Sequence, residues 1–187
     1  MIKFQIDDEI VLSELVDDDA PAVFACVKAN SKHLMEFMHW MKPNYSIVDA
    51  REYIAQSTVD AKQKKSLYLG IFRGEKFIGS VGFVDFDRDA KATEIGYWID
   101  RTEEGKGIVT RSCRLLINYA FSELKMNRIQ IRCSAENVRS AAIPEGFAFV
   151  KEGVLRQSQF RNGKLHDFLV YGLLAADWGD ANQHQNL

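Results

Sequence analysis

The chain has 187 residues, of which 47% are hydrophobic, and a formal net charge of −2 at pH 7. This length fits one domain, which we expect to span 1–187, and the apolar content supports a substantial core. The small net charge argues against a general affinity for nucleic acid, because such binding needs an excess of basic side chains.

Cysteine usage and the first residues also limit the class of protein. The three cysteines, an odd number spread over the chain, argue against a disulfide framework and show no metal-ligand spacing. We expect Cys113 and Cys133 to be small core residues. The N-terminus has no apolar run of signal-peptide length, and no stretch approaches the length of a membrane span. We therefore expect a cytoplasmic protein without a metal centre.

Apolar periodicity predicts a mixed order of helices and strands. The elements expected in the first half are a strand over 2–15 interrupted near residues 7–8, helices over 22–29, 31–40 and 48–64, and strands over 67–72 and 77–86. Those expected in the second half are a strand over 92–99, a helix over 109–124, a strand over 127–133 and a hairpin over 154–174 with an Asn-Gly turn. This order predicts an α/β or α+β fold around one mixed sheet, with a flexible tail over 179–187.

The most informative segment is the glycine-bearing turn from Glu103 to Thr110. Gly105 and Gly107 let the backbone approach a ligand closely, and the first N–H groups of the following helix have no partners inside it. Such a helix start binds phosphate groups, and Lys106 adds a positive charge. The spacing fits neither a P-loop nor a dinucleotide-binding motif. A solvated turn before a helix is the alternative that this segment alone leaves open.

The segment after the strand over 127–133 helps to decide between a phosphate-binding turn and a solvated turn. It contains a spaced set of polar and aromatic residues, namely Asn137, Ser140, Glu145 and Phe149. This spacing resembles N-x-x-S-x-x-x-x-E-(K/R)-x-G-F of the GNAT superfamily of acetyl-CoA-dependent N-acetyltransferases, with Gly146 and Ala148 as departures. The glycine turn is similar to the pyrophosphate loop of that superfamily, (Q/R)-x-x-G-x-(G/A). There Glu104 replaces Gln or Arg, and Val109 replaces Gly or Ala.

The resemblance is strongest to the ribosomal-protein-serine N-acetyltransferase branch. It covers about 9–178 and is most specific over 92–171. In that region the order of four motifs agrees with the order in the branch: the EIGYWI strand, the GKGI loop, the N-x-x-S segment and the late Asn-Gly hairpin. It implies the GNAT fold, which is a single mixed, mostly antiparallel sheet flanked by helices. It also implies acetyl-CoA as co-substrate and no metal.

The resemblance implies a cofactor site along the glycine turn and the preceding strand. The turn would hold the pyrophosphate, and the end of the strand would pair with the pantetheine arm. The expected cofactor-binding residues are Trp98, Ile99, Gly105, Lys106, Gly107, Ile108, Val109, Thr110 and Asn137. For Asn137, capping of the next helix is an alternative that stays open.

Acetyl transfer to an amine needs a base for the amine proton and benefits from an acid for the leaving thiolate. Glu94 is the candidate base, because it shares a strand face with Gly96 and Trp98, and a Glu on this strand is the base in some GNAT members. The alternative is an exposed or ion-paired Glu. Ser140 is the candidate acid, or the hydroxyl that hydrogen-bonds the CoA sulfur. A helix-cap or helix-surface serine is the alternative there.

Gln159 is a departure from related ribosomal-protein acetyltransferases, which carry a Glu at this hairpin position that is proposed as base. An amide cannot take a proton at neutral pH, so the departure favours Glu94 and leaves the ribosomal substrate open. Residues 34–40, rich in Met and aromatic side chains, either line an acceptor pocket or form a buried helix face.

We expect an N-acetyltransferase in which a primary amine attacks the thioester of acetyl-CoA directly. By analogy with the ribosomal branch, the first choice of acceptor is a protein N-terminal α-amine, such as that of a ribosomal protein. One alternative is a small amine, such as a polyamine, an amino acid or an aminoglycoside. Another is a catalytically weak acyl-CoA-binding protein that regulates a partner. We expect neither nucleic acid nor membrane among the partners, and a homodimer stays open.

Overall fold

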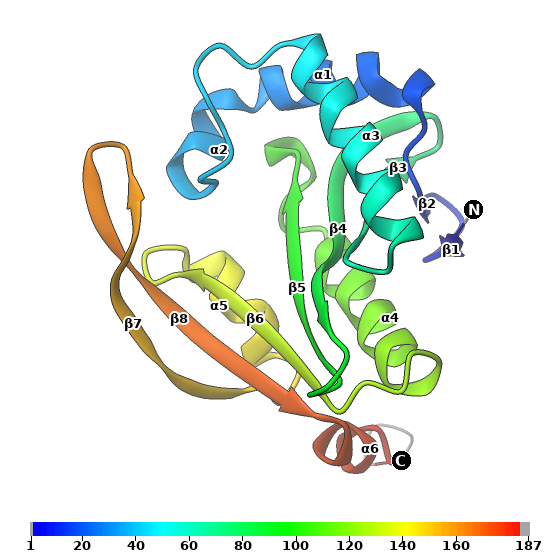
Figure 1. Ribbon diagram of the computed structural model, residues 1–187, viewed down its shortest axis with the longest axis vertical. Coiled ribbons are helices and arrows are strands. Elements are labelled where there is room, and N and C mark those ends of the chain that lie inside the picture. Colours follow the sequence, from blue (N-terminus) through cyan, green and yellow to red (C-terminus); the bar gives the residue numbers. More distant parts are fainter. Residues whose placement is uncertain (1, 184–187) are drawn as a thin grey trace.

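The computed structural model describes residues 2–183, which fold around one eight-stranded sheet (Figure 1). The strands are β1 (Lys3–Gln5), β2 (Ile10–Ser13), β3 (Leu67–Arg73), β4 (Lys76–Asp87), β5 (Ala92–Ile99), β6 (Arg128–Ser134), β7 (Val150–Arg161) and β8 (Lys164–Leu174). Their order in the sheet is β1-β2-β3-β4-β5-β6-β8-β7. Every neighbouring pair is antiparallel except β5 and β6, which are parallel. The mixed, mostly antiparallel sheet expected from the sequence is confirmed.

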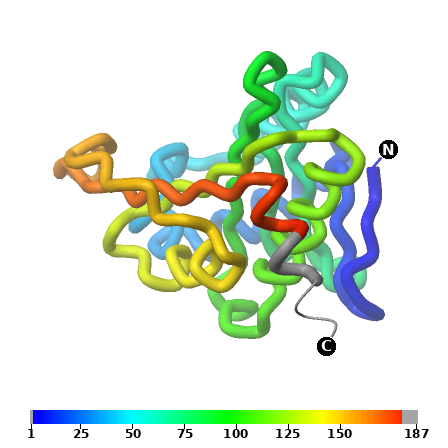
Figure 2. Tube along the Cα trace, turned by 90° about the horizontal axis from the view of Figure 1, so that it is seen from below, coloured from blue at the N-terminus to red at the C-terminus, as the bar shows by residue number. Residues whose placement is uncertain are grey.

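The helices cover this sheet. They are α1 (Ala20–Ala29), α2 (Ser31–Phe37), α3 (Ile47–Lys62), α4 (Ile108–Ser122), α5 (Val138–Glu145) and α6 (Ala175–Gln183), with short 3₁₀ turns at Asp17–Asp19 and Arg101–Glu103. One cluster of buried apolar side chains joins α1, α2 and α3, and a larger one joins α4 to the central strands. The β7–β8 hairpin lies at the end of the molecule opposite β1 and β2 (Figure 2).

The sheet opens between its two parallel strands. β5 and β6 pair only from Ala92 to Glu94, where Glu94 lies opposite Gln130. Beyond that point β5 continues beside β4 to Ile99, whereas β6 continues beside β8 to Ser134. The two halves of the sheet therefore diverge, as Figure 1 shows. This divergence leaves one edge of β5 without a neighbouring strand, and that edge positions the functional site.

Turn and cap chemistry explains several boundaries. The carboxylate of Asp7 accepts hydrogen bonds from the N–H groups of Glu9 and Ile10 at 2.9 and 2.8 Å, which builds the interruption between β1 and β2. Ser46 caps α3, since its hydroxyl accepts from Asp49 N–H while the Asp49 side chain returns to Ser46 N–H. The interruption near residues 7–8 agrees with the sequence-based expectation.

Three segments differ from that expectation. The hairpin begins at Val150 rather than at residue 154. The second helix ends at Phe37 rather than at residue 40, because Met38 has an extended backbone and its side chain turns into the cavities described below. The tail expected over 179–187 is helical as far as residue 183. Trp178 fixes this helix: its indole is 6% exposed and donates to Asn118 Oδ1 at 2.8 Å. Residues 184–187 lie outside the described part of the chain.

Candidate active site

Two adjoining cavities lie where β5 and β6 separate, with volumes of about 840 and 660 Å³. We call the larger one the acceptor cavity and the smaller one the cofactor cavity. The residues that line both are Phe37, Met38, Tyr97, Trp98, Asn137 and Ser140. Molecules bound in the two cavities would therefore share this wall.

The glycine turn forms the outer part of the cofactor cavity. Gly105 and Gly107 have φ values of +74° and +70°, a conformation that favours glycine, and Gly107 caps α4 by accepting from Arg111 N–H at 3.0 Å. Ile108 is buried and anchors the first turn of the helix. The first N–H groups of this helix have no hydrogen-bond acceptor within the helix, so they remain available to an anion. The residues of the turn that line the cavity are Glu103, Glu104, Gly105, Gly107, Ile108, Val109 and Thr110, and Ile99 joins them from β5.

Lys106 is the one predicted cofactor residue that the structure does not bring to the lining of this cavity. Its Nζ lies 2.9 Å from Oε2 of Glu103, an oxygen that also accepts from Arg73 at 2.9 Å. Glu103 is buried, and its basic neighbours lower its pKa against the opposing effect of burial. Lys106 thus neutralises the buried Glu103 carboxylate, so the positive charge predicted for the phosphates is already paired.

Asn137 and Ser140 lie together at the start of α5. Asn137 Oδ1 accepts from the Ser140 N–H at 3.1 Å, so the capping role left open by the sequence is present. Both side chains also line the two cavities. Capping and contact with a ligand are therefore compatible for Asn137, because the cap uses only its carbonyl oxygen.

Tyr97 was missed by sequence reasoning. Its hydroxyl donates to the Ser140 carbonyl at 3.0 Å and accepts from Ser140 Oγ at 3.2 Å. Burial raises the pKa of Tyr97 well above its ordinary value, so the phenol keeps its proton. In the sequence, the aromatic residues of β5 indicated only a strand and gave no sign that Tyr97 belongs to the site. The alternation along this strand could have indicated that Tyr97 points away from the face that carries Glu94.

Glu94 lines the acceptor cavity at the point where β5 and β6 part. Its carboxylate accepts from Arg132 Nε at 2.7 Å and from Gln130 Nε2 at 3.3 Å. Burial raises the pKa of Glu94 above its ordinary value, and the Arg132 guanidinium opposes this shift. Glu94 is therefore both ion-paired and placed on the cavity wall, and a raised pKa moves a carboxylate toward the range of a useful base.

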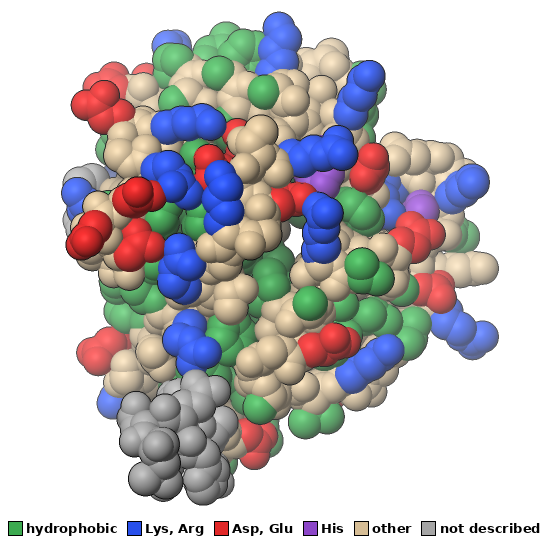
Figure 3. All heavy atoms as spheres, turned by 180° about the vertical axis from the view of Figure 1, so that it is seen from behind, with side chains coloured by type: hydrophobic (Ala, Val, Ile, Leu, Met, Phe, Trp, Pro, Cys, Tyr) green, Lys and Arg blue, Asp and Glu red, His purple; other side chains and the backbone are tan. Residues whose placement is uncertain are grey.

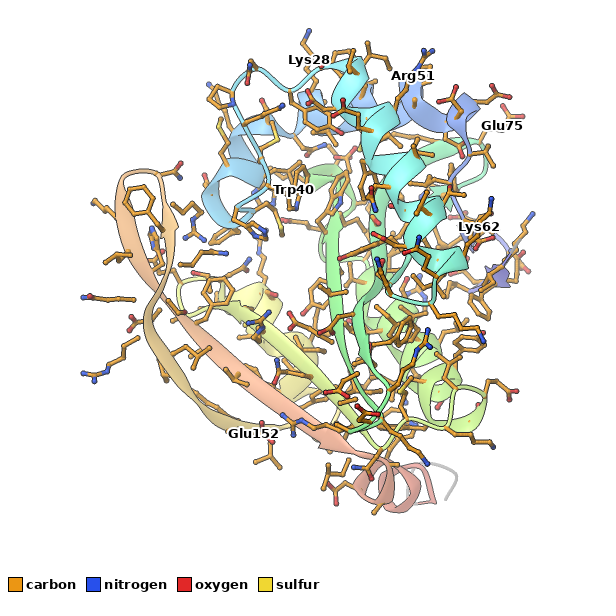
Figure 4. All side chains as sticks on the ribbon, in the orientation of Figure 1. Lys28, Trp40, Arg51, Lys62, Glu75 and Glu152 are labelled. Atoms are coloured by element: carbon orange, nitrogen blue, oxygen red, sulfur yellow. The ribbon has the colours of Figure 1, made fainter. Side chains whose placement is uncertain are left out.

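Aromatic and acidic side chains form the rest of the acceptor cavity. Its aromatic residues include Trp40, Tyr45, Tyr53, Tyr68 and Trp98. Trp40, on the segment between α2 and α3, lies 6.1 Å from Trp98 between ring centres (Figure 4). Four carboxylates line the cavity but only two Lys or Arg side chains do. Those two, Lys42 and Arg132, are each paired with a carboxylate of the same wall. The cavity therefore suits a positively charged guest.

The remaining candidates of the sequence lie at this same cavity. Gln159 lines it from β7 and accepts from Arg161 at 3.3 Å. Of residues 34–40, Leu34 is buried in the core, whereas Phe37 to Trp40 face the acceptor cavity. The buried-face interpretation is confirmed for Leu34, and the acceptor-pocket interpretation stays a prediction for Phe37 to Trp40. Cys113 and Cys133 are buried as free thiols, as expected.

Comparison with known proteins identifies the architecture. A family model described as "Acetyltransferase (GNAT) domain" matches residues 9–150. The chain belongs to the GNAT acetyltransferases. The Bacillus subtilis protein named "Putative ribosomal N-acetyltransferase YdaF" is 32% identical over 95% of this chain and 98% of its own length. The ribosomal-protein-serine acetyltransferase of Escherichia coli (strain K12) is 23% identical over 89% of this chain and 93% of its own length.

Solved structures agree with the family assignment. A Microcin C7 self immunity acetyltransferase, MccE, in complex with acetyl-CoA and AMP superposes with a TM-score of 0.85 at 30% identity, covering 90% of this chain and 94% of its own. A structure described only as a probable acetyltransferase gives a TM-score of 0.90 at 31% identity, covering 95% and 99%. This GNAT protein is therefore an acyltransferase that uses acetyl-CoA, and the cofactor cavity has the glycine turn and free helix N–H groups that a pyrophosphate needs.

The described residues contain no cluster of His, Cys, Asp and Glu side chains that could hold a metal ion. Over the same residues, no helix is long and apolar enough to cross a membrane.

Proposed function

We propose that this GNAT enzyme acetylates a protein N-terminal α-amine, with Glu94 as base and Ser140 at the leaving sulfur. The observation that carries the proposal is the position of these side chains. Glu94 lies in the acceptor cavity, and Ser140 lies on the wall that this cavity shares with the cofactor cavity. The thioester of acetyl-CoA held along the open edge of β5 would lie between them.

The chemistry is a direct transfer. Glu94, directly or through a water molecule, takes a proton from the ammonium group, and the neutral amine attacks the acetyl carbonyl carbon. A backbone N–H near Trp98, on the open edge of β5, donates to the oxyanion that forms. The carbon–sulfur bond then breaks and the thiolate takes a proton from Ser140. The attacking nitrogen gives up its second proton through water, and this proton restores the Ser140 hydroxyl. The products are the acetylated amine and CoA.

The acidic acceptor cavity supports an ammonium-bearing acceptor. Glu52 and Asp60 on α3 add two carboxylates to those already paired with Lys42 and Arg132. Relatives named for ribosomal proteins support a protein N-terminus as that acceptor. The acidic wall also supports a second candidate, a polyamine, because several separated ammonium groups gain more from the further carboxylates of Glu52 and Asp60 than a single α-amine does.

The proposal is tested by measuring thiol release from acetyl-CoA with matched acceptors. One peptide is offered with a free N-terminus and again with its N-terminus blocked, so that only the α-amine differs. Release with the free peptide alone supports the proposal. Equal release with both would mean that a side-chain amine is the acceptor. A higher kcat/KM for spermidine than for any peptide would replace the proposal with the polyamine reading. CoA binding without release across the panel would favour the regulatory protein.

A further inference from the structure

Two carboxylates line the cavity where the cofactor phosphates are expected, and one of them, Glu103, is paired with Arg73 and Lys106. Glu104, on the glycine turn, bridges two basic side chains across the cofactor cavity: His33 Nε2 lies 2.7 Å from its Oε1, and an Arg139 guanidinium nitrogen contacts its Oε2. All three residues line this cavity. His33 comes from α2 and Arg139 from α5, so the bridge spans two walls. The molecular surface is hollowed on the face behind that of Figure 1, with acidic and basic side chains mixed around the hollow (Figure 3).

This bridge conflicts with the charge of the ligand. The glycine turn offers its N–H groups to an anion, and CoA carries a pyrophosphate and a further phosphate. A carboxylate in the same cavity repels these groups as long as it keeps its charge. It also occupies the guanidinium that could otherwise bind a phosphate with two parallel hydrogen bonds.

We propose that Arg139 is a phosphate-binding residue for CoA and that Glu104 masks it in the free protein. On binding, a phosphate of CoA replaces the Glu104 carboxylate on the Arg139 guanidinium, and Glu104 keeps His33. The proposal rests on the placement of the cofactor in the cavity at the glycine turn. It does not depend on which amine is acetylated.

The exposure of the three side chains fits such an exchange. The Arg139 side chain is 75% exposed, whereas those of Glu104 and His33 are 18% and 21% exposed. Arg139 is therefore the partner with room to move, and the Glu104–His33 pair is the part held in place. An exposed ion pair contributes little stability, so a phosphate with more charge can displace the carboxylate at small cost.

Exchange of partners on Arg139 and simple repulsion by Glu104 predict different salt dependences of the affinity for CoA. Only the exchange changes the number of ion pairs formed on binding. In the native protein one ion pair breaks as another forms, so the affinity for CoA depends weakly on salt. In Glu104→Gln the guanidinium is already released, and binding forms an ion pair without breaking one. The affinity should then rise roughly fivefold at low salt and fall more steeply as salt is added.

The experiment is titration calorimetry of CoA, without an acceptor, into the native protein, Glu104→Gln, Arg139→Gln and the double variant. Glu152→Gln is the matched control, because Glu152 forms the same kind of pair with Arg128 outside both cavities. We expect tighter binding in Glu104→Gln, weaker binding in Arg139→Gln, and no change in the control. In the Arg139→Gln background, the substitution of Glu104 should lose most of its benefit.

Two results would overturn the proposal. Weaker or unchanged binding in Glu104→Gln would mean that the carboxylate does not mask anything. A full gain that persists without Arg139 would mean that Glu104 acts only by repulsion.

Dephospho-CoA, which lacks the 3′-phosphate, identifies the phosphate that Arg139 binds. If the gain in affinity of Glu104→Gln disappears with this probe, Arg139 binds the 3′-phosphate. If the gain remains, Arg139 binds the pyrophosphate. Absence of acetyl transfer to any peptide would leave these binding results unaffected.

Discussion

Arg132 Nε donates to Glu94 Oε2 at 2.7 Å, and this contact joins β6 to β5 at the point where the two strands separate. The guanidinium stabilises the charged form of a carboxylate whose pKa burial raises. The pair therefore sets the proton affinity of the proposed base as well as its position. A partly buried carboxylate with a raised pKa is suited to take a proton from an ammonium group.

Glu94→Gln should lower turnover by roughly 10²-fold or more, as loss of a general base usually does. The affinity for acetyl-CoA should barely change, because Glu94 lines the acceptor cavity only. The defect should be greatest at low pH, where the amine most needs help to lose its proton. Steady-state kinetics from pH 6 to 9, with calorimetry for CoA, would measure both. Native turnover in this variant would point to water or backbone as the proton acceptor.

Arg132→Gln should shift the acidic limb of the pH–rate profile to higher pH. Arg132 lowers the pKa of Glu94 against burial, so its removal raises that pKa further. At a given pH more of the base is then protonated and inactive. The profile of kcat/KM measures this shift. Arg111→Gln is the control, since Arg111 pairs with Asp7 and lines neither cavity. An unmoved limb would show that Glu94 does not govern it.

Ser140→Ala should reduce turnover less than Glu94→Gln does. A CoA thiol has a pKa near that of cysteine, about 8.5, so the thiolate is already a fair leaving group near neutral pH. The defect should shrink as pH rises, because protonation of the leaving group matters less there. Tyr97→Phe, which removes the hydroxyl 3.2 Å from Ser140 Oγ, should show the same pH trend. Weaker CoA binding with intact turnover at saturation would leave Ser140 as a binding or capping residue only.

The parts of the site that the sequence predicted are those built from neighbouring residues. Gly105 and Gly107 needed only a local signal, because their positive φ and the helix after them belong to one short segment. The same is true of Asn137, which caps the helix that carries Ser140. The Asn-Gly hairpin also formed as predicted, since its turn chemistry is local.

The parts that the sequence did not predict depend on contacts between distant segments. Tyr97 and Ser140 are 43 positions apart, and only the divergence of β5 from β6 brings them together. Lys106 is held by Glu103, whose other partner, Arg73, comes from β3, and the sequence did not indicate this pairing. Ion pairs leave no periodic pattern in a sequence, because any of several basic side chains could satisfy a given carboxylate.

Gly107→Glu should abolish the rise in melting temperature that CoA produces in the native protein. The substitution places a side chain and a negative charge at the start of α4, among the N–H groups proposed to hold the pyrophosphate. Gly107→Ala is the control for backbone strain, since both variants force a Cβ into a residue with φ of +70°. Thermal unfolding with and without CoA measures the shift. A preserved shift in a folded Gly107→Glu protein would place the phosphates elsewhere.

Gly82→Ala should destabilise the sheet that carries the site, whereas Gly153→Ala should not. A Cβ at position 82 would lie 2.7 Å from Tyr68 Cα and closer still to the Leu67 carbonyl oxygen, so β3 and β4 would have to separate. Such overpacking costs about 2–3 kcal/mol. At position 153 a Cβ meets no atom within 4 Å, and Ala has less chain entropy to lose on folding. Thermal melts should show a drop of roughly 5–10 °C for Gly82→Ala and less than about 2 °C for Gly153→Ala. Equal melting temperatures for the two variants would show that β3 and β4 are not as close at Gly82 as the structure indicates.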